Sequence, residues 1–159
     1  NPHESLAFDQ SAQIIINHVN DGVKIAEKAN LPKAIIYFIR THHGRGKAKF
    51  FYNSFKNKYP DREIDEELFT YPGPNPFTKE TAILMMADSV EAASRSLKEH
   101  TEESISALVN KIIDSQIADG LLKNAPLTFK DVEAIKTIFT DKLKTMFHTR
   151  VSYPDLKKP

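Results

Sequence analysis

The sequence predicts an all-α protein, a packed array of about six helices. Apolar residues recur at intervals of three and four along most of the 159-residue chain, which places them on one face of a helix. Residues that start helices, such as Thr and Asp, precede these segments, and Gly or Pro follows several of them. Strand signals, such as alternating apolar and polar residues, are absent from the sequence.

The length and composition suit one soluble domain, which we place at residues 1–159. The 22 basic and 21 acidic residues nearly cancel, which argues against a nucleic-acid polymer as partner. There is no cysteine, so disulfides and thiolate chemistry are excluded. No apolar run approaches the roughly 18 residues of a membrane span, so we expect no membrane contact by the chain itself.

The first helix is expected to run from a cap at Asp9 or Ser11 to about Asn30. Its apolar stripe comprises Ile15, Val19, Val23 and Ala26. Gly22 lies one turn after His18 and is expected to leave space beside that imidazole.

A second helix follows, with Pro32 suited to its first turn and Gly44 to the left-handed residue after its end. Its core stripe comprises Ile35, Ile36 and Ile39. Helical spacing from these residues turns His42 and His43 toward the buried side.

A third helix is expected at 47–58, with Phe50, Phe51 and Phe55 as its anchors. We interpret these rings as core aromatics rather than as a platform for stacking bases. The segment that follows, as far as Pro76, is irregular, with one turn expected at 65–68.

Three capped helices complete the array. Thr78 caps a helix to about Lys98, and Thr101 caps another that ends before Gly120. Thr128, with Asp131 three residues later as in a capping box, starts a last helix that ends near His148.

Four polar residues lie in or at the end of helical segments with apolar neighbours: His18, His42, His43 and Asp88. Burying such groups is costly unless they are paired, hydrogen-bonded or bound to a metal. Together, three imidazoles and a carboxylate suit a transition metal. Alternatively, each histidine is a boundary residue with a hydrogen bond, and Asp88 forms a salt bridge to a neighbouring helix.

The helix that contains Asp88 also places Leu84, Glu91 and Arg95 on the same face. Glu91 and Arg95 are spaced for an ion pair. The stripe either lines a cleft, where Arg95 orients Glu91 as a supporting group or reaches a phosphate, or forms a solvated face.

The loop at 44–49 directly follows the histidine pair and carries Arg45 and Lys47. These cations, with the backbone N–H groups of the loop, suit a phosphate; a solvated basic turn is an equal alternative.

Several segments together resemble one family. His18, residues 31–44, residues 71–76 and residues 148–154 are similar to the cytoplasmic HD domain of the bacterial seven-transmembrane HD proteins. The block at 80–96, with Ala-Asp-Ser-Val-Glu-Ala-Ala-Ser-Arg at 87–95, is the most specific part of this resemblance.

The resemblance implies a metal-dependent phosphodiesterase that hydrolyses cyclic di-AMP to the linear dinucleotide with two transition-metal ions, Fe or Mn. His18, His42, His43 and Asp88 match metal ligands in this family, and Asp88 is also the implied catalytic residue. The family further implies a membrane-anchored parent protein whose HD domain lies on the cytoplasmic side of the bacterial inner membrane.

The chain departs from the family because it contains no His-Asp dipeptide. The family's doublet, and another ligand histidine, lie upstream of the helix that contains His18. We therefore expect the chain to be the C-terminal part of an HD domain, with partial or absent metal and little activity alone. Two alternatives remain: a phosphohydrolase of another nucleotide, or a degenerate non-catalytic HD module that binds a nucleotide or a partner protein.

Overall fold

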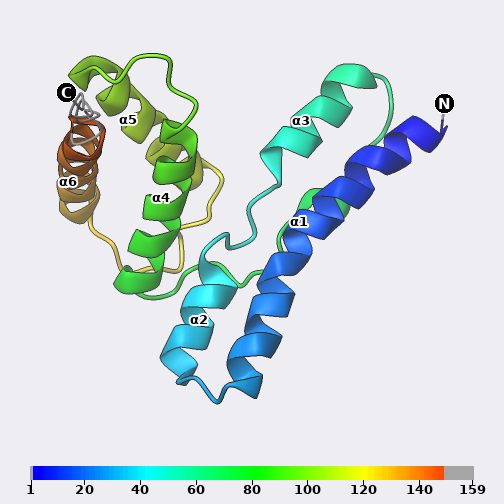
Figure 1. The fold of residues 1–159 in the computed structure, drawn as a ribbon, viewed down its shortest axis with the longest axis horizontal. Coiled ribbons are helices and arrows are strands. Elements are labelled where there is room, and N and C mark those ends of the chain that lie inside the picture. Colours follow the sequence, from blue (N-terminus) through cyan, green and yellow to red (C-terminus); the bar gives the residue numbers. More distant parts are fainter. Residues whose placement is uncertain (1, 149–159) are drawn as a thin grey trace, which may run out of the picture.

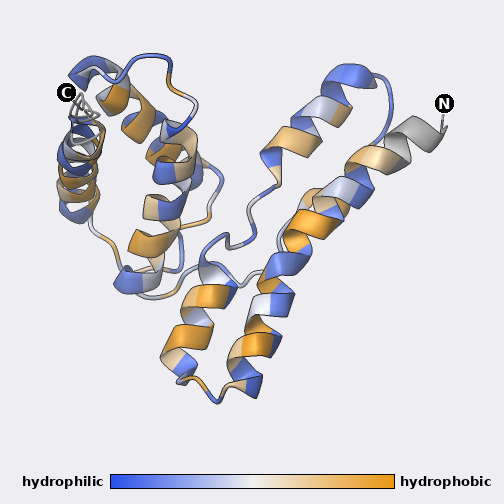
Figure 2. Cartoon of the chain, viewed as in Figure 1, coloured by the Kyte–Doolittle hydropathy of each residue, from blue (hydrophilic) through white to orange (hydrophobic). Residues whose placement is uncertain are grey.

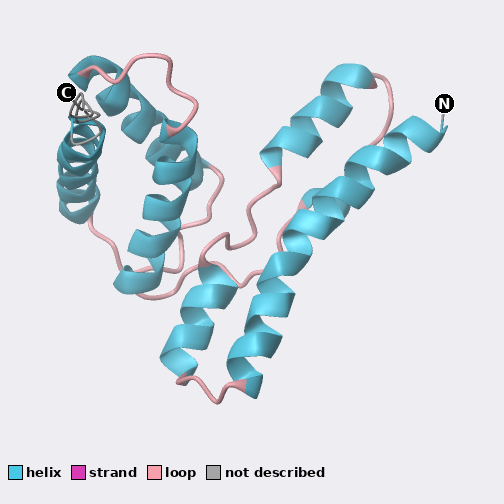
Figure 3. Ribbon diagram, viewed as in Figure 1, coloured by secondary structure: helices cyan, strands magenta, loops and turns pink. Residues whose placement is uncertain are grey.

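The computed structural model describes the backbone of residues 2–148 and the side chains of residues 7–148, and within that part it contains helices and no strand (Figure 3). The helices in chain order are α1 (Pro2–Lys28), α2 (Lys33–Thr41), α3 (Lys49–Lys58), the 3-10 helix η1 (Glu66–Phe69), α4 (Lys79–Ser94), α5 (Glu102–Ala118) and α6 (Phe129–His148). The predicted all-α class with six α-helices is confirmed. Residues 149–154, part of a segment that carried the family resemblance, lie outside the described residues.

The helices form two groups (Figure 1). In one group α2, α3 and η1 pack against the long helix α1, and in the other α5 packs between α4 and α6. Contacts between α2 and α4 join the groups. Among the described residues, no helix is both long and apolar enough to cross a membrane.

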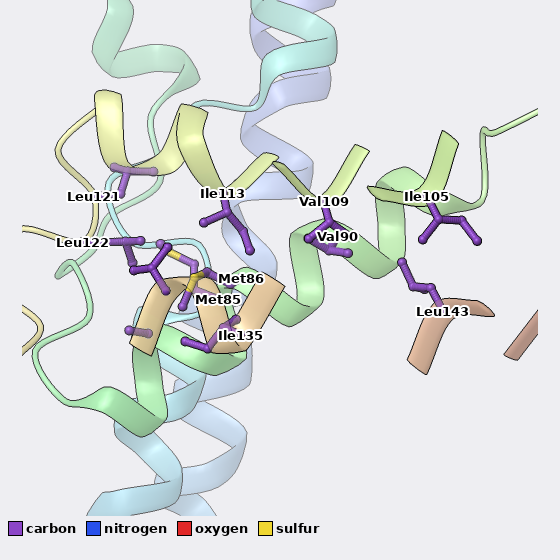
Figure 4. Close-up of a cluster of buried hydrophobic side chains, with 12 residues drawn as sticks. Met85, Met86, Val90, Ile105, Val109, Ile113, Leu121, Leu122, Ile135 and Leu143 are labelled. Carbon is purple, nitrogen blue, oxygen red and sulfur yellow. The ribbon is translucent and has the colours of Figure 1, made fainter. Parts of the chain in front are cut away.

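Each group has its own apolar core, because each helix carries hydrophobic residues on one part of its surface and hydrophilic residues on the rest (Figure 2). In the α4–α6 group, Met86, Ile105, Val109 and Ile113 are fully buried (Figure 4). The second core comprises Ala12, Ile16, Val19, Ala48, Phe55, Phe69 and Tyr71. Burying a large aliphatic or aromatic side chain contributes roughly 1.5–3 kcal/mol, so these cores hold the helices in place.

The caps predicted for the last three helices are confirmed. Thr78 and Thr81 form a reciprocal capping box at the start of α4. Thr101 caps α5, and Thr128 and Asp131 exchange hydrogen bonds of 2.9 and 3.0 Å at the start of α6. The turn expected at 65–68 is η1.

Helix α1 begins at Pro2, upstream of the expected cap at Asp9 or Ser11. The Ser11 hydroxyl donates to the Ala7 carbonyl, as it does inside a helix. The extension is stabilised because Phe8 packs against the core beneath α1.

The predicted start of α3 and the predicted end of α4 were also wrong. Helix α3 begins at Lys49 instead of residue 47, because Lys47 instead pairs with Thr70 in an isolated bridge. Helix α4 ends at Ser94 instead of about Lys98. At this end the Ser94 hydroxyl donates a hydrogen bond to the Glu91 carbonyl.

Two residues assigned to apolar stripes, Ile15 and Ile35, are exposed. Phe50, which was expected to be a core aromatic, is exposed as well. The role expected for Gly22 was also wrong. A Cβ atom on Gly22 would lie 3.1 Å from Cγ2 of Ile39, so this glycine allows close packing of α2 rather than space beside His18.

Candidate metal centre

The three histidines come from the facing helices α1 and α2. His18 lies in α1, and His42 and His43 directly follow α2, which ends at the buried Thr41. The chain then turns at Gly44, which has a φ of 52°, as predicted for a left-handed residue. Asn75 holds the turn, because its Oδ1 accepts a 2.7 Å hydrogen bond from the Arg45 backbone N–H.

The imidazoles meet in one cluster. Each ring offers a nitrogen that lies within 4.8 Å of a nitrogen of the other two rings. The Nε2 atoms of His18 and His42 are 3.0 Å apart. Groups that bind one ion at about 2.1 Å have their donor atoms separated by about 3 to 4 Å, so the cluster has the dimensions of a metal site.

Backbone carbonyls fix which nitrogen of His18 and His42 carries the proton. Nδ1 of His42 lies 2.7 Å from the Ile39 carbonyl oxygen, and Nδ1 of His18 hydrogen-bonds to the Ile15 carbonyl. A carbonyl only accepts, so each Nδ1 donates its N–H. In the neutral rings both Nε2 atoms then carry lone pairs, and these lone pairs face each other. A cation between them removes this repulsion, and the carbonyl contacts are those that orient metal-binding histidines.

His43 is partly buried, and its ring stacks on Tyr71 with centroids 4.2 Å apart. Burial first, and then the neighbouring His42 and His18, lower its pKa from 6.5 to about 3. His43 is therefore neutral at physiological pH, which is the state in which imidazole binds a metal.

Asp88 reaches the cluster from α4. Its Oδ2 lies 3.7 Å from Nδ1 of His43, beyond hydrogen-bond distance but suited to a shared ion. Its side chain is 44% exposed. The structure thus brings the three predicted histidines together and places Asp88 beside His43. His18 and Asp88 are more exposed than their apolar neighbours in the sequence suggested.

A cavity of about 330 Å³ opens beside this cluster. His43 and Asp88 contribute to its wall, and Lys47 and Lys49 from the loop and the start of α3 line it as well. Its apolar part includes Ile15, Phe50, Phe51, Met85, Ala92 and Ile112. Since these residues belong to both helix groups, the cavity lies between them.

The other predicted site residues lie apart from the cavity or are already paired. Lys47 lines the cavity and pairs with Glu66 at 2.8 Å, which raises the pKa of Lys47 chiefly through the hydrogen bond. Arg45 pairs with Glu67 at 2.7 Å and is not among the cavity residues.

Glu91 and Arg95 form the expected ion pair at 2.9 Å. Of the stripe on α4, only Asp88 contributes to the cavity; Leu84, Glu91 and Arg95 do not.

Sequence reasoning missed two residues of the site. Tyr71 precedes the Pro-rich segment and supports His43, a role without a local sequence signal. Gln116 lines the cavity, is buried, and donates a 2.8 Å hydrogen bond to Ser89 Oγ. Its signal was available, because Gln116 follows Ile105, Val109 and Ile113 on the buried face of α5.

The all-α fold and the histidine cluster define the class. The chain belongs to the HD domain family: the family model of the HD domain matches residues 2–93, more than half of the chain. This confirms the family resemblance predicted from the sequence. The family is metal-dependent, in keeping with the histidine cluster.

Particular relatives are similar over nearly the whole chain. Cyclic-di-AMP phosphodiesterase PgpH of Bacillus subtilis (strain 168) is 41% identical over 158 residues, which cover 99% of this chain and 22% of that protein. The protein of the same name from Listeria monocytogenes is 37% identical over 157 residues, again 99% of this chain and 22% of that protein. The chain therefore spans about a fifth of the length of these relatives.

A solved structure agrees with the fold. The crystal structure of the L. monocytogenes phosphodiesterase PgpH HD domain in complex with cyclic-di-AMP has a TM-score of 0.84 and 36% sequence identity to this chain. The match covers 96% of this chain and 71% of that chain.

Proposed function

We propose that this chain is part of a metal-dependent phosphodiesterase that hydrolyses cyclic di-AMP to the linear dinucleotide. The observation that carries the proposal is the cluster of His18, His42 and His43, in which the Nε2 atoms of His18 and His42 lie 3.0 Å apart. Two relatives named for hydrolysis of cyclic di-AMP, and a structural neighbour bound to it, support the choice of substrate.

His18, His42, His43 and Asp88 are the proposed metal ligands, and Asp88 is also the proposed catalytic residue. Imidazole with carboxylate favours Fe or Mn. When bound, such ions activate water and neutralise the charge that develops on a phosphodiester. We propose two ions in the complete HD domain, of which this chain holds the part bounded by these four side chains.

Other groups of the chain orient the three histidine rings and set the charge beside them. The Ile39 and Ile15 carbonyls keep the proton on Nδ1 of His42 and His18, so each Nε2 stays free to bind. Tyr71 holds the ring of His43, and Asp88 places negative charge beside the cluster.

Lys47 is the proposed phosphate contact, since it lines the cavity and stays protonated beside Glu66. Arg45 and Arg95 are proposed to act on substrate from outside the cavity, after leaving Glu67 and Glu91 respectively. Before substrate binds, Glu91 supports the site by holding Arg95 in the ion pair seen in this structure.

We also propose that residues 1–159 form the C-terminal part of a single HD domain in a longer, membrane-anchored protein, on the cytoplasmic side of the bacterial inner membrane. The chain covers 22% of each of the two relatives, which supports its place in a longer protein.

The test combines metal binding with turnover. Calorimetric titration with Mn²⁺ is expected to show binding by the chain and at least a tenfold weaker affinity for His18→Ala, as expected when a ligand or its support is lost. The control is His100→Ala, which removes a histidine outside the cluster. Equal Mn²⁺ affinity in all three proteins would refute the metal site.

Turnover is followed by chromatography of cyclic di-AMP and its linear product. Hydrolysis by the full-length gene product that is lost in Asp88→Ala supports the proposal. Tight binding of cyclic di-AMP with no hydrolysis by the full-length product would instead support the non-catalytic HD module, which the lack of a His-Asp dipeptide in this chain keeps as the second candidate.

A further inference from the structure

Phe50 is an unusual residue of α3. The same helix buries Phe55 and partly buries Phe51, whereas Phe50 is 76% exposed. Single exposed apolar residues are common and need no explanation by themselves. Phe50 differs because it also lines the cavity whose wall includes His43 and Asp88.

The neighbourhood of this ring combines an aromatic contact with an anchored start of α3. Phe50 meets Phe51 edge to face, with centroids 5.2 Å apart and an interplanar angle of 88°. The adjacent Lys49 ties the start of α3 to α5 through a 3.0 Å hydrogen bond to Ser115 Oγ. The backbone that carries Phe50 is thus tied to α5, and the ring keeps most of its surface available to a ligand.

The size of the cavity shows which part of a ligand needs such a face. Its volume of about 330 Å³ is at the lower end of the range for ligand pockets, so a whole cyclic dinucleotide does not fit inside. A phosphodiester is drawn to the end with Asp88, His43 and the proposed metal. A purine attached to it then reaches the rim, where Phe50 is both exposed and part of the wall.

We propose that Phe50 is the stacking platform for one purine base of the bound cyclic dinucleotide. The inference rests on the proposed function and adds a residue that positions the substrate. Every base has a π face, so stacking contributes affinity without selecting adenine over guanine. Phe50 therefore sets how tightly a cyclic dinucleotide binds, and not which base it contains.

The first experiment measures affinity by calorimetry, with Mn²⁺ and the bis-phosphorothioate of cyclic di-AMP, which resists hydrolysis. Phe50→Ala is expected to weaken binding roughly 5- to 150-fold, the range for loss of one base–aromatic stack. Phe50→Tyr is expected to bind like the unsubstituted chain, whereas Phe50→Leu, which is apolar but has no ring, is expected to bind weakly. The matched control is Phe129→Ala, a 92% exposed ring on α6 that lines a different cavity.

The second experiment reads the stack directly. The chain contains no tryptophan, so Phe50→Trp introduces a single indole. Its fluorescence is expected to be quenched when the analogue binds, and that of Phe129→Trp is expected to stay constant. This measurement keeps the proposal testable even if Phe50→Ala does not fold.

The outcomes separate this inference from the proposed function. The role of Phe50 is overturned, and the proposed function is not, if the unsubstituted chain binds the analogue tightly but two results are missing. These are a loss of affinity in Phe50→Ala that Phe129→Ala does not show, and quenching of fluorescence in Phe50→Trp. Loss of affinity in Phe50→Leu no greater than in Phe50→Tyr also overturns it, since an apolar contact then suffices. Absence of any binding by the unsubstituted chain overturns the role of Phe50 in this chain, whereas the proposed function is overturned by absence of both binding and hydrolysis in the full-length gene product.

Discussion

Replacing His43 by Phe is expected to make the metal-free protein less sensitive to acid. Phenylalanine has a similar ring that can keep the stack on Tyr71, but it cannot take up a proton. In the unsubstituted protein His43 is only 23% exposed and lies beside two other imidazoles, so its protonation opposes folding. The Asp88 carboxylate at 3.7 Å favours the imidazolium, but exposure to water weakens that attraction.

The sign and size follow from linkage between proton binding and folding. The folded-state pKa of about 3 lies below the ordinary 6.5, so between these values the unfolded chain binds a proton that the folded chain does not. The stability due to His43 is therefore complete above about pH 6.5 and is lost as the pH falls toward 3. Between about pH 7.5 and about pH 5 the loss amounts to about 2 kcal/mol, and this figure holds for any folded pKa below about 4.

The assay is urea unfolding at the two pH values, with a chelator present to remove metal. The free energy of unfolding of the unsubstituted protein is expected to fall between the two pH values by about 2 kcal/mol more than that of His43→Phe. Comparing each protein with itself cancels any constant cost of the substitution. The same pH dependence in both proteins would refute the reasoning, because it would mean that His43 takes up its proton as easily in the folded as in the unfolded chain.

The remaining predictions concern other parts of the molecule. In the absence of metal, Asp88→Ala is expected to leave the melting temperature nearly unchanged, since the side chain is partly hydrated. When metal is added, the substituted protein is expected to bind fewer ions. A loss of about 3–5 kcal/mol in unfolding free energy would instead mark a structural ion pair. Ile113→Ala is expected to lower the free energy of unfolding in urea by about 2–5 kcal/mol, because Ile113 is fully buried in the α4–α6 core. The control Ile14→Ala, at an exposed position, should change it by less than about 0.5 kcal/mol. Similar values for the two substitutions would contradict the assigned core. Thr78→Ala is expected to cost about 1 kcal/mol through loss of the α4 cap, and an unchanged unfolding midpoint would show that the capping box contributes nothing.

Much of the fold was predictable because the signals are local. Thr78, Thr101 and Thr128 cap their helices as expected, and Gly44 and Gly120 have the positive φ angles that follow helix ends. Capping bonds and left-handed turns involve residues only a few positions apart, so the sequence shows both partners at once.

The predictions were wrong where residues far apart in the sequence determine the extent of a helix or the burial of a side chain. Helix α1 extends upstream of Ser11 because Phe8 finds apolar partners in the core that includes residues of α3 and η1. Phe50 has the same composition signal as Phe55, yet only the position of α3 relative to α1 determines which ring is buried.

The sequence by itself determined the helical class, most helix boundaries and the four candidate ligands, because periodicity, caps and a histidine pair are short-range patterns. Tertiary structure alone decided how these ligands meet: the 3.0 Å approach of His18 to His42, the stack of Tyr71 on His43, and the pairing of Arg45 with Glu67. The pKa of His43 belongs to the same category. These properties depend on distance and exclusion of water, which arise only when α1, α2 and α4 pack around one point.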